Sequence, residues 1–382
     1  MVSTTADALV IGTGAVGASC AFHLARAGLR TVVVDQFGGP AEGSTGRCFA
    51  SVRGQWADDL NIEMSWRSIQ AFRSFPEEHG VDVGYSASGY LFLVPPRAWP
   101  AHLAAAARQR AHGVPVDVLD PGAAAEITPL DPEGLAGATW GPADGVVDPH
   151  GLTTAYLRMA RARGTEVRYR RPVTSAGRAG PGWVVRAGPD EIAAGVVINA
   201  AGGWAAQTAA LAGLAVPVAH SRRNIYAGAP GALGQRLPMT IDLSTGVYLR
   251  SEADRLLFGG PASPRSAGYS TEVDWPWLEE VLSLGLRRFG WLADLPLDRS
   301  ACWAGTYEMT PDHQGILGAH PDAPTWFNAC GFSGHGFMQA PEIGRLLAEE
   351  VVTGRIESLD VTPLRIERFA RAAASVPVGM VV

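Results

Sequence analysis

Hydrophobic positions near the start of the chain change their spacing twice, and the changes predict a strand, a helix and a second strand. Residues 8–11 are a short apolar run, typical of a buried parallel strand. Across residues 15–27 apolar positions recur at helical spacing, and Gly28 then favours a helix stop. Residues 31–34 form another buried strand, which ends in Asp35. The segment therefore predicts a βαβ unit of about 30 residues.

Three glycines occupy the turn between the first strand and the helix of this unit. Gly12 permits a tight turn, Gly14 lets the backbone approach a diphosphate, and Gly17 lets the helix pack closely on the strand. The N–H groups and dipole of the helix N-terminus favour a diphosphate there. Asp35, 18 residues after Gly17, can accept hydrogen bonds from a ribose. The pattern predicts a dinucleotide site, for NAD or FAD, in preference to a turn without a ligand, and three further residues should contact the dinucleotide, namely Ala15, Val16 and Gln36.

Three later segments combine strands, loops or glycine turns, and helices. Residues 145–173 have the pattern of a loop, an amphipathic helix and a strand, and residues 196–205 that of a strand running into a glycine turn and a helix. Residues 326–355 predict a strand, a glycine-rich turn and a long helix. The last turn is a second place where helix N–H groups could face a cofactor.

The sequence between these segments has the alternation of an antiparallel sheet. Residues 85–94 and 246–260 each have the pattern of a strand pair joined by a turn. Residues 273–291 have helical spacing, and we expect this helix to pack on the sheet. A chain of 382 residues is too long for one core of usual size, which favours two domains.

Composition narrows the class of protein. Hydrophobic residues make up 47% and charged residues 18%, as in ordinary globular chains, and the net charge of −6 argues against nucleic acid as a partner. All 31 basic residues are arginines, and abundant arginine, alanine and glycine favour a GC-rich bacterial genome. Four cysteines without a CxxC pair, no leader pattern and no apolar stretch of about 18 residues predict a cytoplasmic protein that neither crosses nor binds a membrane. We expect no metal site.

Six motifs together resemble one family of flavoenzymes. They are VIGTGAVGAS at 10–19, SVRGQW at 51–56, GVVDP at 145–149, VINAAGGWA at 197–205, YEMTPD at 307–312 and GFSGHGFMQAP at 331–341. In order and over nearly the whole chain, they are similar to the FAD-dependent amine and amino-acid oxidases that include D-amino acid oxidase, glycine oxidase and sarcosine oxidase. The resemblance implies an α/β fold, with a Rossmann-like FAD-binding domain of discontinuous segments and an inserted substrate domain on an antiparallel sheet. The implied limits are 1–84, 145–220 and 315–370 for the FAD domain, 85–144 and 221–314 for the substrate domain, and 371–382 for a loose C-terminal tail.

The resemblance also implies a reaction. A hydride leaves a carbon next to nitrogen for flavin N5, the substrate becomes an imine, and O2 reoxidises the flavin to give H2O2. The substrate is then a small amine or amino acid, with a secondary amine favoured. A dehydrogenase that passes electrons to a partner protein or a quinone is the alternative, and a non-enzymatic flavin module also stays open. A flavin monooxygenase is less favoured, because no second glycine motif for NAD(P)H follows a strand. Monomer and oligomer are both compatible with the sequence.

Four residues are candidates for contact with the substrate. Arg53 matches the arginine that pairs with the substrate carboxylate in sarcosine oxidase-like enzymes, although it could instead bridge a loop and a domain. Tyr307 matches a tyrosine near the substrate, with core packing as the alternative. Tyr248 and Arg250 share one face of a predicted strand, and one face of that strand should line the cavity. Arg250 is then either a second carboxylate ligand or a solvated arginine.

Further residues should contact FAD. Ser44 and Thr45 could touch phosphate or flavin, or could cap a helix. His335 is expected to be a cofactor-loop residue and not a base, because the family reaction needs none. The remaining FAD residues implied by the resemblance are Arg47, Val173, Gly202, Trp204, Gly331, Gly334, Gly336, Phe337 and Met338.

The chain departs from the family pattern at positions that bear on its chemistry. Gly305 stands where monomeric sarcosine oxidases tether the flavin to a cysteine, and Gly46 occupies the stretch of a histidine tether, so FAD should be non-covalent. Met338 stands where the family often places a lysine, which makes the pocket less cationic. No lysine is available to promote reaction with O2. Arg47, Arg53 or Arg250 could substitute, or another acceptor could take the electrons.

Overall fold

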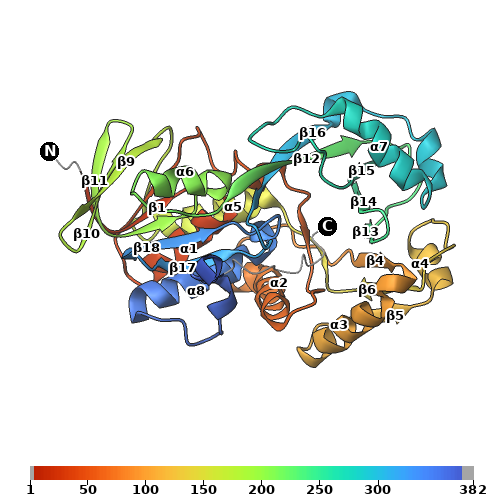
Figure 1. Cartoon of the computed structure of the whole chain (residues 1–382), viewed down its shortest axis with the longest axis horizontal. Helices are drawn as coiled ribbons and strands as arrows, with labels where there is room; N and C mark the ends of the chain where they lie inside the picture. The colour runs from red at the N-terminus through yellow and green to blue at the C-terminus, as the bar shows by residue number, and fades with distance from the viewer. Residues whose placement is uncertain (1–3, 372–382) are drawn as a thin grey trace.

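The structure, a computed structural model, describes residues 4–371, and the chain folds around two eight-stranded sheets (Figure 1). The first sheet lies at the left of Figure 1 and the second at the right. From residue 372 onward the predicted tail lies outside the described residues. Within residues 4–371 no helix combines the length and apolar character that a membrane span requires.

The first sheet carries the predicted βαβ unit. Its strand β1 (Thr4–Ile11) pairs in parallel with β2 (Thr31–Val34) on one side and with β11 (Asp190–Asn199) on the other. The order along the sheet is β17-β18-β11-β1-β2-β8, and β9 and β10 form a hairpin extension beside β11. The bounds of these strands are β8 Glu166–Arg168, β9 Val173–Ala179, β10 Gly182–Ala187, β17 Ile316–His320 and β18 Ala323–Cys330.

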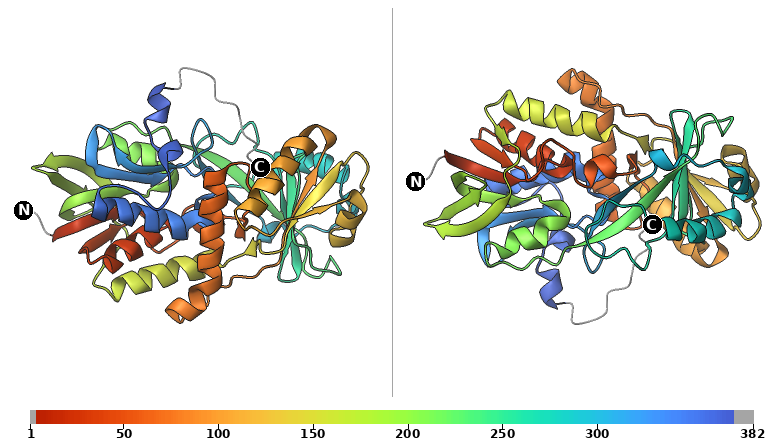
Figure 2. Two further views of the ribbon diagram at one scale, coloured as in Figure 1. Left: turned by 90° about the horizontal axis from the view of Figure 1, so that it is seen from below. Right: turned by 90° about the horizontal axis from the view of Figure 1, so that it is seen from above.

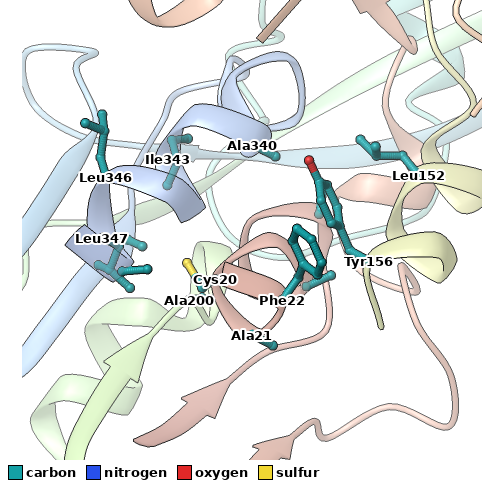
Figure 3. Close-up of a cluster of buried hydrophobic side chains, with 14 of the residues drawn as sticks. Cys20, Ala21, Phe22, Leu152, Tyr156, Ala200, Ala340, Ile343, Leu346 and Leu347 are labelled. Atoms are coloured by element: carbon teal, nitrogen blue, oxygen red, sulfur yellow. The ribbon is translucent and has the colours of Figure 1, made fainter. Parts of the chain in front are cut away.

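Helices cover both faces of the parallel strands, which explains their continuous apolar runs. Ala8 and Val10 of β1 face a core formed with helices α1 (Ala15–Arg26), α5 (Pro149–Arg161) and α8 (Gly336–Thr353). In Figure 3, Phe22 of α1 lies beside Tyr156 of α5, with ring centroids 5.4 Å apart. The opposite face of β1 packs against α6 (Ala205–Ala210).

The second sheet is mostly antiparallel and has the order β16-β12-β15-β14-β13-β4-β6-β5. Helix α7 (Trp275–Leu286) packs on it through Leu278 and Val281. Helix α2 (Asp59–His79), orange in Figure 2, crosses the middle of the molecule between the two sheets. The strand bounds are β4 Tyr90–Val94, β5 Asp117–Leu119, β6 Gly137–Gly141, β12 Ala219–Ala227, β13 Met239–Asp242, β14 Val247–Glu252, β15 Arg255–Gly259 and β16 Trp303–Met309. The remaining elements are β3 Ser51–Val52, β7 Gly145–Val146, α3 Trp99–Ala111, α4 Pro121–Ile127 and α9 Arg368–Arg371.

The α/β fold class predicted from the sequence is confirmed, with two local corrections. Residues 85–94 are not a hairpin: only β4 forms, because Gly89 adopts a left-handed φ of +85° and Ser86 pairs with Val146 instead. The helix predicted over 273–291 ends at Leu286 and is followed by a 3-10 segment. Residues 246–260 do form the expected hairpin, β14 and β15. The limits of the two domains stay a prediction.

Candidate active site

A pocket opens at the carboxyl ends of β1, β2 and β11, where the first sheet meets the second. Such an edge is the usual ligand site of open parallel sheets. The pocket is lined there by all seven residues predicted for the dinucleotide, Gly12, Gly14, Ala15, Val16, Gly17, Asp35 and Gln36. The first turn of the chain and the start of α1 therefore form one wall of this pocket.

The turn before α1 has room for glycine and for no larger residue at two positions. A Cβ on Gly12, whose φ is +115°, would lie 2.3 Å from the Ala200 carbonyl oxygen, and a Cβ on Gly17 would lie 2.1 Å from the Gly12 oxygen. A Cβ on Gly14 would meet only Thr45 Oγ1, at 3.1 Å. Gly12 and Gly17 thus allow the close packing of the turn and of α1 on the neighbouring backbone. Gly14 leaves the helix N-terminus open toward the pocket. This geometry fits a dinucleotide diphosphate.

Asp35 stabilises the turn before α1, besides the contact with ribose that the sequence predicts. Its carboxylate accepts hydrogen bonds from the Thr13 N–H and hydroxyl, at 2.6 and 2.7 Å, and from the Phe37 N–H at 2.8 Å. A carboxylate offers about four acceptor sites, so about one remains for a ligand. Asp35 therefore fixes the turn that carries the glycines and still faces the pocket.

The loop after β2 supplies the next wall. Thr45 Oγ1 accepts a 3.1 Å hydrogen bond from the Ala15 N–H at the start of α1, and Arg47 lines the pocket beside it. Ser44 precedes the 3-10 turn Thr45–Arg47 without capping it, whereas Thr45 does satisfy an N–H of the first turn of α1. Contact of either residue with FAD stays a prediction. The other predicted FAD residues that line the pocket are Ser44, Val173, Gly202, Trp204, Gly334, Gly336 and Phe337.

At its far end the pocket reaches the second sheet. Tyr307 of β16 and Tyr248 of β14 line it, and Arg223 of β12 lies over the Tyr307 ring, 4.6 Å from its centroid. Contact of the two tyrosines with the substrate stays a prediction. Glu308 also lines the pocket and accepts a 2.9 Å hydrogen bond from the Gly331 N–H. Burial raises the pKa of Glu308 to about 7. Arg223 and Glu308 were not predicted from the sequence as residues of the site.

Five predicted residues do not line this pocket. Arg250 is buried, donates hydrogen bonds to the carbonyl oxygens of Phe49 and Ser251, and forms an ion pair with Glu252. It is therefore neither a solvated arginine nor a guanidinium free to bind a substrate carboxylate. Met338 packs in the core between α8 and the first sheet. Gly331 touches the pocket only through its hydrogen bond to Glu308. The last two, Arg53 and His335, lie together beyond Tyr307.

Arg53 is a buried cation without an acidic side chain in contact. Its side chain is 7% exposed, and its guanidinium carbon lies 4.2 Å from the Trp56 ring centroid. Tyr90 and Phe92 flank it as well. Arg53 Nε has no hydrogen-bond partner, and no ion pair to Arg53 forms among residues 4–371. Such a group fits an incoming anion better than a structural bridge.

His335 completes this cluster as a neutral imidazole. Its ring lies edge-on to Trp56, with centroids 4.4 Å apart, and its Nε2 is buried without a partner. Burial, followed by the nearby Arg53 charge, lowers the pKa of His335 well below its ordinary value. A lowered pKa makes the imidazole a weak base, and the expectation that His335 is not the catalytic base stays a prediction.

Comparison with known proteins places the chain among flavoenzymes. Residues 7–350 match the model of the DAO family, described as FAD dependent oxidoreductase. The FAD-dependent oxidoreductase domain-containing protein 1 of Xenopus laevis is 30% identical over 416 residues, covering 95% of this chain and 82% of that protein. The mitochondrial sarcosine dehydrogenase of Homo sapiens is 28% identical over 393 residues, covering 98% of this chain and 42% of that protein. The chain thus spans about two fifths of the length of the sarcosine dehydrogenase.

A solved structure shows the same arrangement of both sheets. The crystal structure of L-proline dehydrogenase from P. horikoshii superimposes with a TM-score of 0.89 and 29% identity, covering 96% of this chain and 98% of that chain. The pocket lined by Gly12, Gly14 and Gly17 fits the FAD that this family uses. The chain therefore belongs to the DAO family of FAD-dependent oxidoreductases, as the sequence motifs predicted.

Proposed function

We propose that this chain oxidises the C–N bond of a small amino acid or amine, with a secondary amine favoured, and that the product is an imine. Sarcosine dehydrogenase and L-proline dehydrogenase, both similar to this chain, are named for secondary amino acids. Bound FAD would supply the acceptor for the hydride that leaves the carbon next to nitrogen. The residues of the chain then have to hold that carbon, exclude water and keep the substrate oriented.

The observation that carries this proposal is the unpaired, buried guanidinium of Arg53. A planar guanidinium can hold a carboxylate through two parallel hydrogen bonds, which fixes its orientation as well as its position. The rings of Trp56, Tyr90 and Phe92 around Arg53 exclude water and strengthen that contact. Tyr307, whose pKa burial raises, stays a neutral phenol able to donate one hydrogen bond to the substrate.

The experiment compares each reactive amino acid with the amine that lacks its carboxylate, for example proline with pyrrolidine. The parent should favour the carboxylated member, and Arg53→Gln should cost it about 2 kcal/mol, or ~30-fold in kcat/KM, while changing the amine little. Arg53→Lys keeps the charge without the planar fork and should recover part of the loss. An Arg53→Gln enzyme that discriminates as the parent does would contradict the clamp.

The electron acceptor has two candidates. O2, giving H2O2, is our first proposal, with the pocket cations Arg47 and Arg223 in the place of the missing lysine. A partner protein or quinone is favoured by the relatives that are named dehydrogenases. The rate at which O2 reoxidises the reduced enzyme separates the two, because a dehydrogenase should reoxidise slowly unless an artificial acceptor is added.

The cellular setting is proposed from composition. We propose a cytoplasmic protein from a bacterium, on the cysteine content and the arginine-rich composition. The sarcosine and dimethylglycine dehydrogenases reported for mammals are mitochondrial. Fractionation of the source cells tests this setting, and a mitochondrial source would contradict it.

A further inference from the structure

A second arginine without an acidic partner lies in the part of the pocket where Tyr307 lies. Arg222 and Arg223 are neighbours on β12 and therefore point to opposite faces of the sheet. Arg222 pairs with Asp274, Nη2 to Oδ2 at 3.3 Å. Arg223 instead lies over Tyr307 and donates to the Ser221 hydroxyl at 2.8 Å and to the Arg222 carbonyl at 3.1 Å. Arg223 makes no ion pair with any acid in the described part of the chain.

The two guanidinium groups share one neighbourhood of phenols. Arg223 lies over the Tyr307 ring, and Gly334, the neighbour of His335, packs against the same ring. His335 and Arg53 both contact Trp56, which places Arg53 beside the same cluster. Burial raises the pKa of Tyr307, and the charges of Arg223 and Arg53 both act against that rise. Arg53 acts in the same way on Tyr90, and Arg223 on Tyr248. The three phenols are neutral at physiological pH, because burial moves each pKa above its ordinary value.

The histidines around this neighbourhood are neutral as well. Burial and then the Arg223 charge lower the pKa of His313, as burial and Arg53 do for His335. Asp144 and Arg53 act on each other electrostatically without an ion pair, and each oxygen of Asp144 already accepts one hydrogen bond, from the Gly54 N–H and from the Gln55 amide. Arg223 has no such counter-charge. Neither of the two cations makes an ion pair with an acid among residues 4–371, and only Arg53 has a carboxyl, that of Asp144, acting on it.

Two neighbouring cations repel each other, and the cost is greatest for the buried Arg53, while Arg223 is half-buried and lines the pocket. An anion at each of them would remove this cost. A substrate with one carboxylate would neutralise Arg53 and leave Arg223 unpaired. We propose that the substrate is an amino acid with two acid groups, the first held by Arg53 and the second by Arg223, which makes Arg223 the residue that sets the substrate class. This proposal rests on the function proposed above, because it takes Arg53 as the first clamp.

The test uses unreactive acids as probes of the FAD-loaded protein. Succinate and butanoate have the same chain length and differ by one carboxylate, as do glutarate and pentanoate. Each acid is titrated while the absorption spectrum of the oxidised flavin is followed. We expect the better dicarboxylate to bind at least tenfold more tightly than its monocarboxylate partner, since a second guanidinium–carboxylate contact is charge-assisted.

Variants assign the effect to a residue. Arg223→Gln should abolish the advantage of the dicarboxylate, and Arg223→Lys should restore part of it. Arg222→Gln, one residue away and on the other face of β12, should keep the advantage. The FAD dissociation constant of each variant is measured in parallel, because an Arg223 that serves the cofactor would instead weaken FAD binding and leave the ratio between acids unchanged.

The outcomes separate this proposal from the one it rests on. Equal binding of succinate and butanoate, and of glutarate and pentanoate, overturns the two-clamp model, as does an Arg223→Gln protein that keeps the ratio. If Arg53→Gln weakens every acid while no dicarboxylate is preferred, the single clamp stands and Arg223 has another role. If Arg53→Gln changes the binding of no acid, the proposed function itself fails.

Discussion

The carboxylate of Asp144 accepts a 2.7 Å hydrogen bond from the backbone N–H of Gly54, the residue next to Arg53. Its other oxygen accepts from the Gln55 amide at 2.9 Å, and Gln55 in turn accepts from the Thr139 hydroxyl at 2.7 Å. Asp144 is thus bonded to the backbone beside the proposed clamp and, through Gln55, to β6 of the second sheet. We infer that Asp144 is a positioning residue for Arg53.

Replacing Asp144 by Asn should loosen the clamp without removing it. An amide offers one oxygen where the carboxylate offers two, so one of the two hydrogen bonds to Gly54 and Gln55 is lost. We expect KM for a carboxylated substrate to rise about fivefold, the equivalent of ~1 kcal/mol, with a smaller change in kcat. Steady-state kinetics on the carboxylated and decarboxylated pair check this, and an equal loss on both members would contradict a positioning role.

The same carboxyl should leave a signature in the pH dependence of stability. Burial raises the pKa of Asp144 to about 7, so between its unfolded value near 4 and about 7 the native state binds more protons than the unfolded state. The unfolding free energy of the parent relative to Asp144→Asn should therefore fall as pH rises through this range, by up to ~1.4 kcal/mol per pH unit. Urea unfolding at pH 5, 6 and 7 with saturating FAD measures it. A difference that stays the same at pH 5, 6 and 7 would show that Asp144 is ionised throughout and would contradict the raised pKa.

Glycine substitutions should separate packing from ligand contact in the first turn. Gly17→Ala places a Cβ against the Gly12 carbonyl and should give protein without flavin, or no folded protein. Gly14→Ala meets only the Thr45 hydroxyl and should fold with weakened FAD binding, by about tenfold. The ratio of flavin to protein absorbance after purification, and FAD titration of the apoprotein, give the readouts. Normal FAD affinity in both variants would contradict the assigned pocket.

FAD should leave the protein on denaturation. A Cβ on Gly305 would lie 2.8 Å from Arg47 Cβ, so this position has no room for a tethering cysteine. Cys48 does line the pocket, but burial raises the pKa of its thiol to about 11, and a thiol in that state is a poor nucleophile. Acid precipitation should leave the yellow colour in the supernatant. Flavin that stays in the pellet and is released by Cys48→Ser would prove a tether at Cys48.

The sequence predicted those features in which the spacing of nearby residues alone determines the local backbone structure. Gly12, Gly14 and Gly17 between two apolar runs predict a βαβ turn, because only glycine allows the close approaches found there. The later motifs added further residues that line the same pocket, although Gly331, His335 and Met338 do not. These features are local in the chain, so periodicity and turn chemistry suffice to find them.

Side chains whose roles depend on distant partners could not be assigned. Arg222 and Arg223 are adjacent arginines, and the sequence alone does not distinguish their roles. Only the pairing of β12 with β16 decides which of the two faces Tyr307. Arg250 was misjudged because one of its partners, the Phe49 carbonyl, lies about 200 residues away. In the sequence Asp144 has the pattern of a turn residue, and only the fold shows that its carboxylate accepts a hydrogen bond from the Gly54 N–H.

Anaerobic titration of the FAD-loaded protein with a panel of mono- and diacidic amino acids shows whether the protein is an FAD enzyme that oxidises a carboxylated amine. We predict that at least one acidic amino acid bleaches the flavin absorbance completely, and that its decarboxylated amine does so far more slowly. A protein that takes up no FAD, or whose bound flavin no amino acid or amine reduces, would contradict this prediction.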